Sequence, residues 1–275
     1  MKLVSFSVGG GDITPGVLRA DEKKIVSLAP LGFASTLDAI KGSFRIDTTD
    51  YFEVDEVKFH APLPNPPRVF AIGLNYRDHA AESKMALPKV PVVFFKMNTA
   101  IIGPGEKIVL PKNSTQPDYE AELAFVIGKG GYRIPSSAWR EHVYGYTMVN
   151  DVSARDVQRA TSQWSLGKSF PTFAPMGPWV VSKDEIADPH RLGISMTIGG
   201  ERLQDANTSQ MIYQIPALIE YLSSIVPLQV GDVISTGTPA GVGMGRTPQR
   251  WLKAGDEMVV SIEGIGELRN AVVGE

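Results

Sequence analysis

Two glutamates separated by one residue, Glu120 and Glu122, are the positions at which this sequence first suggests metal chemistry. They lie in a β-like run over 119–127, and side chains of a strand alternate between its two faces, so both carboxylates should share one face. Like charges at this spacing repel, and a cation would offset the repulsion. The alternative is a solvated strand face. Because Ala124 and Val126 continue the same face toward a core, we predict a pair of metal ligands.

A third carboxylate, Asp151, follows the β-like run Tyr144–Asn150, where a short helix is expected to begin. Aspartate often caps helices, which is the structural alternative. Ser153 and Asp156 already form a capping-box pattern, which would leave Asp151 free to bind a ligand. The chain contains no cysteine, so its metal ligands must be harder donors. Three carboxylates suit Mg²⁺ or Mn²⁺, and Ca²⁺ could take their place in a crystal.

Three further residues could take acid–base or electrostatic roles. His79 is one of four histidines, and Glu82 follows it at helical spacing, where a carboxylate can hydrogen-bond the imidazole and raise its basicity. An ordinary surface pair on a short helix fits this spacing equally well. Lys168 lies among small and aromatic residues. It would be either a solvated loop lysine or a cation that contacts a substrate oxygen.

The composition excludes several classes of function. The formal net charge is −3, so the chain lacks the basic surplus that a nucleic-acid partner requires. No apolar run approaches the roughly 18 residues that span a bilayer, and the start lacks the apolar core of a signal peptide. We therefore expect a cytoplasmic protein without a membrane partner. Gly167-Lys168-Ser169 lacks the spacing of a phosphate loop, and the glycines at 241–245 lack that of a dinucleotide cradle.

Short β-like runs separated by glycine and proline turns must position these residues. They cover Val69–Leu74, Val92–Phe95, Tyr119–Ile127, Tyr144–Asn150, Trp179–Val181, Ile194–Ile198, Val233–Thr236 and Met258–Ile262. A domain boundary is expected in the proline cluster at 62–67. The pattern predicts a β-dominated α+β fold with a small N-terminal domain at 1–62 and a catalytic domain at 63–275.

One hairpin and one helix are also predicted. Gly199-Gly200 should form a tight hairpin turn, because glycine accepts the positive φ that such turns require. Apolar residues recur at helical spacing after two candidate N-caps, Thr208 and Ser209. They are Ile212, Ile215, Ile219, Leu222 and Val226, and we expect Pro216 to bend this helix.

Five motifs, taken in order, resemble the fumarylacetoacetate hydrolase family, in its branch of acylpyruvases and 2-hydroxyhepta-2,4-diene-1,7-dioate isomerases. They are Asn75–Glu82, Tyr119–Glu122, Asp151–Gln158, Leu166–Phe170 and Thr236–Gly243. The resemblance covers about residues 65–273. It implies rolled, mostly antiparallel β-sheets and a homodimer.

The resemblance also implies roles for individual residues. Glu120, Glu122 and Asp151 would bind the metal, and His79 and Glu82 would lie on a lid helix as the catalytic pair. Lys168 would be the catalytic lysine. Arg155, Gln158 and Thr238 match positions that contact substrate oxygens in the family.

These roles imply an enzyme that acts on a small 2-oxo acid through its enolate, with the metal as Lewis acid. We expect hydrolytic C–C cleavage of a 2,4-dioxo acid, such as an acylpyruvate or a sugar-derived diketo acid, because a His–Glu pair can activate water. Decarboxylation of an oxaloacetate-type acid and isomerisation of a 2-hydroxydienoate are the alternatives at the same site. A non-catalytic binding protein is less favoured, because the motif residues that catalysis requires are all present.

Overall fold

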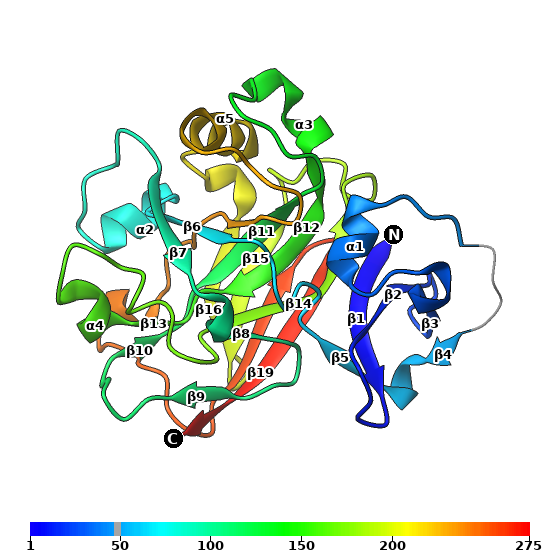
Figure 1. The fold of residues 1–275 in the computed structure, drawn as a ribbon. Helices are drawn as coiled ribbons and strands as arrows, with labels where there is room; N and C mark the ends of the chain where they lie inside the picture. The colour runs from blue at the N-terminus through cyan, green and yellow to red at the C-terminus, as the bar shows by residue number, and fades with distance from the viewer. Residues whose placement is uncertain (47–50) are drawn as a thin grey trace.

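The computed structural model describes residues 1–46 and 51–275, and within them 19 strands form three sheets while the helices are short. This β-dominated α+β architecture confirms the predicted fold class (Figure 1). The predicted β-like runs all fall on strands, with ends that differ by a few residues.

The large sheet has 12 strands in the order β4-β3-β2-β1-β14-β12-β11-β17-β6-β7, with β5 paired to β1 and β8 to β14. Most pairs are antiparallel, but β17 runs parallel to β6 and β14 runs parallel to β8. The strands are β1 (Lys2–Val8), β2 (Thr14–Leu18), β3 (Lys24–Ser27), β4 (Phe52–Glu53), β5 (Val57–His60), β6 (Val69–Gly73), β7 (Val92–Lys96), β8 (Ile101–Ile102), β11 (Ala121–Ile127), β12 (Val143–Asn150), β14 (Ala174–Ser182) and β17 (Val233–Ser235).

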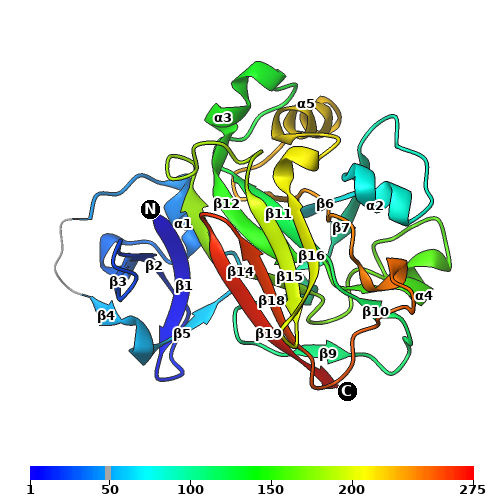
Figure 2. The ribbon, with the colours of Figure 1, turned by 180° about the vertical axis from the view of Figure 1, so that it is seen from behind.

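A second sheet packs against the large one, and a separate pair of short strands joins the segment before β11 to the segment after β12. The second sheet has five strands in the order β16 (Glu201–Asn207), β15 (Gly193–Ile198), β18 (Glu257–Ile262), β19 (Gly266–Gly274) and β9 (Ile108–Leu110). Figure 2 shows β15, β18 and β19 crossing in front of β11, β12 and β14. The strand pair is β10 (Pro117–Asp118) with β13 (Ser153–Ala154). The main hydrophobic core lies between the two larger sheets.

Strand β11 shows the predicted alternation. Leu123 and Phe125 are buried in the main core between the sheets. Ala124 and Val126 point the other way, into a second core beside the N-terminal strands. Because both faces of β11 are buried, a charged side chain at its start must be satisfied by other protein groups or by a bound ion.

The helices are peripheral, and six 3-10 turns accompany them in the described residues. The helices are α1 (Thr36–Lys41), α2 (Arg77–Glu82), α3 (Trp139–His142), α4 (Arg155–Arg159) and α5 (Ile215–Ile225). The turns are Ala29–Leu31, Val54–Glu56, Asn98–Ala100, Ser136–Ala138, Thr208–Gln210 and Gly243–Gly245. None of the helices in 1–46 and 51–275 combines the length and the hydropathy needed to cross a bilayer.

The start predicted for the long helix was wrong. Helix α5 begins at Ile215, so Pro216 lies in its first turn, where its missing N–H breaks no intrahelical hydrogen bond. Thr208 is not its cap: the hydroxyl accepts a hydrogen bond from Leu192 N and donates one to Pro189 O. Ile212 and Val226 lie outside the helix, so the apolar spacing continues beyond both of its ends.

The predicted hairpin is confirmed, and the N-terminal strands extend the large sheet. Gly199 and Gly200 have φ of 58° and 86° and connect β15 to β16. The N-terminal elements β1–β5 and α1 lie at one side of the molecule (Figure 1). Because β1 pairs with β14, the strands β1–β5 belong to the large sheet. The division at residue 62 stays a prediction.

Candidate active site

The three carboxylates predicted as metal ligands lie together at the ends of β11 and β12. The strand register pairs Ala121 with Asn150, and Asp151 N then donates to Glu120 O at 2.9 Å. This register places Asp151 beside both glutamates. One carboxylate oxygen from each of the three side chains lies within 4.8 Å of the others, and all three residues are buried.

Two lysines neutralise part of this negative charge. Lys168 Nζ donates to Glu120 Oε2 at 2.6 Å and to Asp151 Oδ2 at 2.8 Å. Only 2% of the Lys168 side chain is exposed, so it is not a solvated loop lysine. Lys96 Nζ donates to the other oxygen of Asp151 and, at 3.2 Å, to Val152 O. Sequence reasoning missed Lys96, whose only signal is a lysine at the end of an apolar strand.

Arg155 is held by a carboxylate that sequence reasoning did not assign. Its Nε donates to Asp118 Oδ2 at 2.9 Å, and its Nη2 lies 2.6 Å from Glu120 Oε1. Its Nη1 donates to Gln158 Oε1 at 3.0 Å. Asp118 also accepts hydrogen bonds from the main-chain N–H groups of Gly243 and Met244. Asp118 therefore holds Arg155 in place and connects the glycine-rich loop, residues 241–245, to the same site.

The environment shifts the pKa values of the two glutamates in opposite directions. Burial alone would raise the pKa of Glu120, but Arg155 and Lys168 lower it well below its ordinary value. Burial raises the pKa of Glu122 well above its ordinary value, and the charges of Asp151 and Glu120 raise it further. Glu122 accepts hydrogen bonds from Ser235 Oγ and Gly237 N instead of from a cation.

The chemistry of these donors fits a divalent ion. Four buried carboxylates, those of Asp118, Glu120, Glu122 and Asp151, face three buried cations, Lys96, Arg155 and Lys168. One negative charge is thus not neutralised, and no salt bridge within the described chain reaches Glu122. Oxygen donors with surplus negative charge are the ligands that Mg²⁺ and Mn²⁺ prefer.

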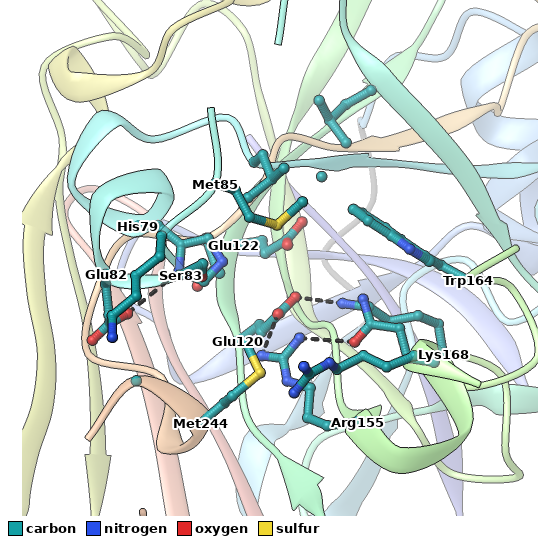
Figure 3. A pocket seen from close by; sticks show the side chains of 18 of the residues that line it. His79, Glu82, Ser83, Met85, Glu120, Glu122, Arg155, Trp164, Lys168 and Met244 are labelled. Atoms are coloured by element: carbon teal, nitrogen blue, oxygen red, sulfur yellow. Dashed lines mark hydrogen bonds and ion pairs between the residues drawn. The ribbon is translucent and has the colours of Figure 1, made fainter. Parts of the chain in front are cut away.

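His79 and Glu82 lie on α2, at the opposite side of the cavity from Lys168 and Arg155 (Figure 3). His79 Nδ1 lies 3.4 Å from Glu82 Oε2, and only 7% of the His79 side chain is exposed. Glu82 also accepts a hydrogen bond from Gly241 N at 3.0 Å. Glu82 therefore connects α2 to the glycine-rich loop, and it leaves Nε2 of the imidazole for other partners.

One cavity of about 650 Å³ is lined by His79, Glu82, Glu120, Glu122, Arg155, Gln158, Lys168 and Thr238. Gln204 Nε2 donates to Thr238 Oγ1 at 2.8 Å and so orients that hydroxyl. Apolar side chains, including Trp164 and Met85, form other parts of the wall (Figure 3). Gly73 permits this wall, because a Cβ there would lie 2.3 Å from the Trp164 ring. The structure thus brings every predicted site residue except Asp151 to the cavity surface, and Asp151 lies directly behind it.

The predicted capping box of α4 is wrong, although Asp151 is indeed no cap. The N-cap is Ala154, which has no side-chain cap. Ser153 Oγ donates to Asp151 O at 2.9 Å, and Asp156 accepts from Ser114 Oγ at 2.7 Å. Asp156 also accepts a hydrogen bond from Val157 N at 2.9 Å, but the reciprocal Ser153–Asp156 bonds of a capping box are not formed.

The family model described as "Fumarylacetoacetate (FAA) hydrolase C-terminal" matches residues 68–273. The chain belongs to the fumarylacetoacetate hydrolase family. This confirms the resemblance. "Oxaloacetate tautomerase fahd2, mitochondrial" from Xenopus laevis is 47% identical over 78% of this chain and 67% of its own length. "Oxaloacetate tautomerase YisK" from Bacillus subtilis is 45% identical over 80% of this chain and 75% of its own length.

A solved structure supports the same assignment at the level of fold. The chain is similar to a fumarylacetoacetate hydrolase from psychrophilic Exiguobacterium antarcticum, with 36% identity and a TM-score of 0.90 over 100% of both chains. The family is one of enzymes that act on small molecules. This chain is therefore an enzyme of the fumarylacetoacetate hydrolase family with an acidic triad that could bind a divalent metal.

Proposed function

We propose that this enzyme interconverts the enol and keto forms of a small 2-oxo acid of the oxaloacetate type, with a divalent metal as cofactor. One observation carries the proposal: the imidazole of His79 and the carboxylates of Glu120 and Glu122 line the same cavity, together with Lys168 and Arg155. A proton carrier thus faces the place where enolate charge would be stabilised. The printed names of the two tautomerases, which are statements about those proteins, support this choice over hydrolytic cleavage.

The chain's own residues account for the proton movement. His79 Nε2 would take a proton from C3 of the keto acid while a C2–C3 double bond forms and the 2-oxo oxygen gains the electron pair; protonation of that oxygen then yields the enol. Glu82, on the other side of the ring, would stabilise the imidazolium. Lys168 and Arg155 would stabilise the negative charge that develops on the substrate oxygens. Gln158 and Thr238 would orient those oxygens by hydrogen bonds.

When bound by Glu120, Glu122 and Asp151, the metal would supply Lewis-acid stabilisation of the enolate. We propose Mg²⁺ or Mn²⁺ because all three donors are carboxylates. A homodimer and a cytoplasmic location stay predictions, as does the absence of nucleic-acid and membrane partners. The Xenopus relative, by contrast, is named as mitochondrial.

Hydrolytic C–C cleavage of a 2,4-dioxo acid is the second candidate. The same His79–Glu82 pair, with its 3.4 Å contact, could deprotonate a water molecule that attacks the 4-carbonyl. Decarboxylation of oxaloacetate would draw on the same enolate stabilisation. Enol–keto exchange breaks a C3–H bond, whereas hydrolysis and decarboxylation both break the C3–C4 bond and differ in whether water attacks C4 or C4 leaves as CO₂.

A substrate panel tests the proposal. The chelator-treated protein, reloaded with Mg²⁺ or Mn²⁺, is assayed with oxaloacetate, an acylpyruvate and a 2-hydroxydienoate, and Glu122→Gln serves as the control that weakens the triad. We expect the metal-loaded protein to accelerate the enol–keto exchange of oxaloacetate. The ultraviolet absorbance of the enol measures this exchange. The proposal would be overturned in favour of the second candidate if the protein cleaved the acylpyruvate while the enol–keto exchange of oxaloacetate ran no faster than in buffer alone.

A further inference from the structure

Two cations that line the cavity take no part in the proposed chemistry. They are Arg159 and Lys84, and both are exposed to solvent. Within residues 1–46 and 51–275 neither one makes an ion pair. In contrast, Arg155 contacts both Asp118 and Glu120, and Lys168 already contacts two buried carboxylates. The positive charge of the cavity wall that is not already paired with a buried carboxylate therefore lies at the solvent end of the cavity.

Helix α4 explains how Arg159 comes to line the cavity. Arg155, Gln158 and Arg159 occupy positions i, i+3 and i+4, which share one face of a helix. All three line the cavity, but Arg155 and Gln158 are buried whereas Arg159 is exposed. This face of α4 therefore extends from the carboxylate triad toward the opening, and Arg159 is its outermost member. Lys84 comes from the segment that follows α2.

We propose that Arg159, assisted by Lys84, binds the second carboxylate of a dicarboxylate 2-oxo acid and so selects dicarboxylates over monocarboxylates. This inference rests on the proposed function, which places the first carboxylate and the 2-oxo group at the triad. Apart from Arg155 and Lys168, which contact the triad carboxylates at its inner end, the cavity wall beside Arg159 and Lys84 includes Glu82, Trp164 and Met85, which cannot form an ion pair with a carboxylate. A guanidinium matches a carboxylate through two parallel hydrogen bonds, which an ammonium does not reproduce.

Arg159→Gln, Arg159→Lys and the wild type test this selectivity. Each is assayed for enol–keto exchange with oxaloacetate, a dicarboxylate, and with phenylpyruvate, a monocarboxylate. Arg159→Gln should lower kcat/KM for oxaloacetate by about 10- to 100-fold, the range expected for losing hydrogen bonds to a charged group. The loss should appear mainly in KM, and phenylpyruvate exchange should change less than about twofold. Arg159→Lys should recover part of the oxaloacetate activity.

A matched variant and the wild type separate the outcomes. Arg191→Gln removes another exposed arginine, one that is absent from the cavity wall, and should leave both substrates unaffected. An equal loss on both substrates, or unchanged kinetics with oxaloacetate, would overturn the role of Arg159 and leave the proposed function intact. A wild-type protein that accelerates neither substrate would overturn the proposed function, and this inference with it.

Discussion

Glu120 and Glu122 belong to one triad, yet neutralising them should affect the stability of the metal-free protein in different ways. Glu122 Oε2 accepts hydrogen bonds from Ser235 Oγ at 2.6 Å and from Gly237 N at 2.9 Å. The amide oxygen of a glutamine can accept both bonds, while the buried charge and its repulsion by Glu120 and Asp151 disappear. Glu122→Gln should therefore leave the free energy of unfolding unchanged or raise it.

Glu120→Gln, in contrast, removes a charge that two buried cations share. Arg155 Nη2 and Lys168 Nζ each lie 2.6 Å from one of its carboxylate oxygens. Removing one partner of a buried ion pair typically costs about 3–5 kcal/mol. Because Arg155 keeps Asp118 and Lys168 keeps Asp151, we expect the lower end of this range. At about 2–4 °C per kcal/mol, the melting temperature should fall by about 6–12 °C.

Thermal unfolding followed by circular dichroism measures both variants at one pH, first in excess chelator and then with Mn²⁺. In chelator, Glu120→Gln should melt well below the wild type and Glu122→Gln at or above it. At a metal concentration about 100 times the dissociation constant, the wild type should gain about 2.7 kcal/mol, and both variants should lose most of this gain. If the two variants were destabilised equally in chelator, the account of which cations neutralise which carboxylate would be refuted.

Three other predictions concern the proton carrier, a close backbone contact and the assembly. His79→Ala should slow enol–keto exchange about 10²–10⁴-fold but keep the metal-induced rise in melting temperature, and exchange at the wild-type rate would show that another group moves the proton. Gly167→Ala would place a Cβ 2.4 Å from Gln158 N, so KM should rise. The control Gly274→Ala, whose Cβ would have no atom within 4 Å, should leave KM unchanged. Equal effects of the two substitutions on KM would contradict the steric argument. Light scattering should give the mass of two chains, and the mass of one would exclude the homodimer.

The sequence was most informative where one strand or one turn decides the outcome. The shared face of Glu120 and Glu122 follows from the period of a strand, and it holds because Ala124 and Val126 on the same face enter a core. The turn at Gly199-Gly200 likewise depends on the backbone freedom of two adjacent residues. The start of α5 was missed because apolar spacing does not by itself show where the backbone becomes helical.

The candidate site itself could be predicted only in part. The sequence alone placed Glu120 and Glu122 on one face and named Asp151 as a third carboxylate, and the family resemblance agreed. What brings Asp151 to them is the pairing of β11 with β12, a contact between segments distant in sequence. Only the tertiary structure showed that Lys96 and Asp118 are buried beside them. A local pattern tells which face a side chain occupies, whereas burial and charge pairing depend on which faces meet, and that is decided by the packing of the whole chain.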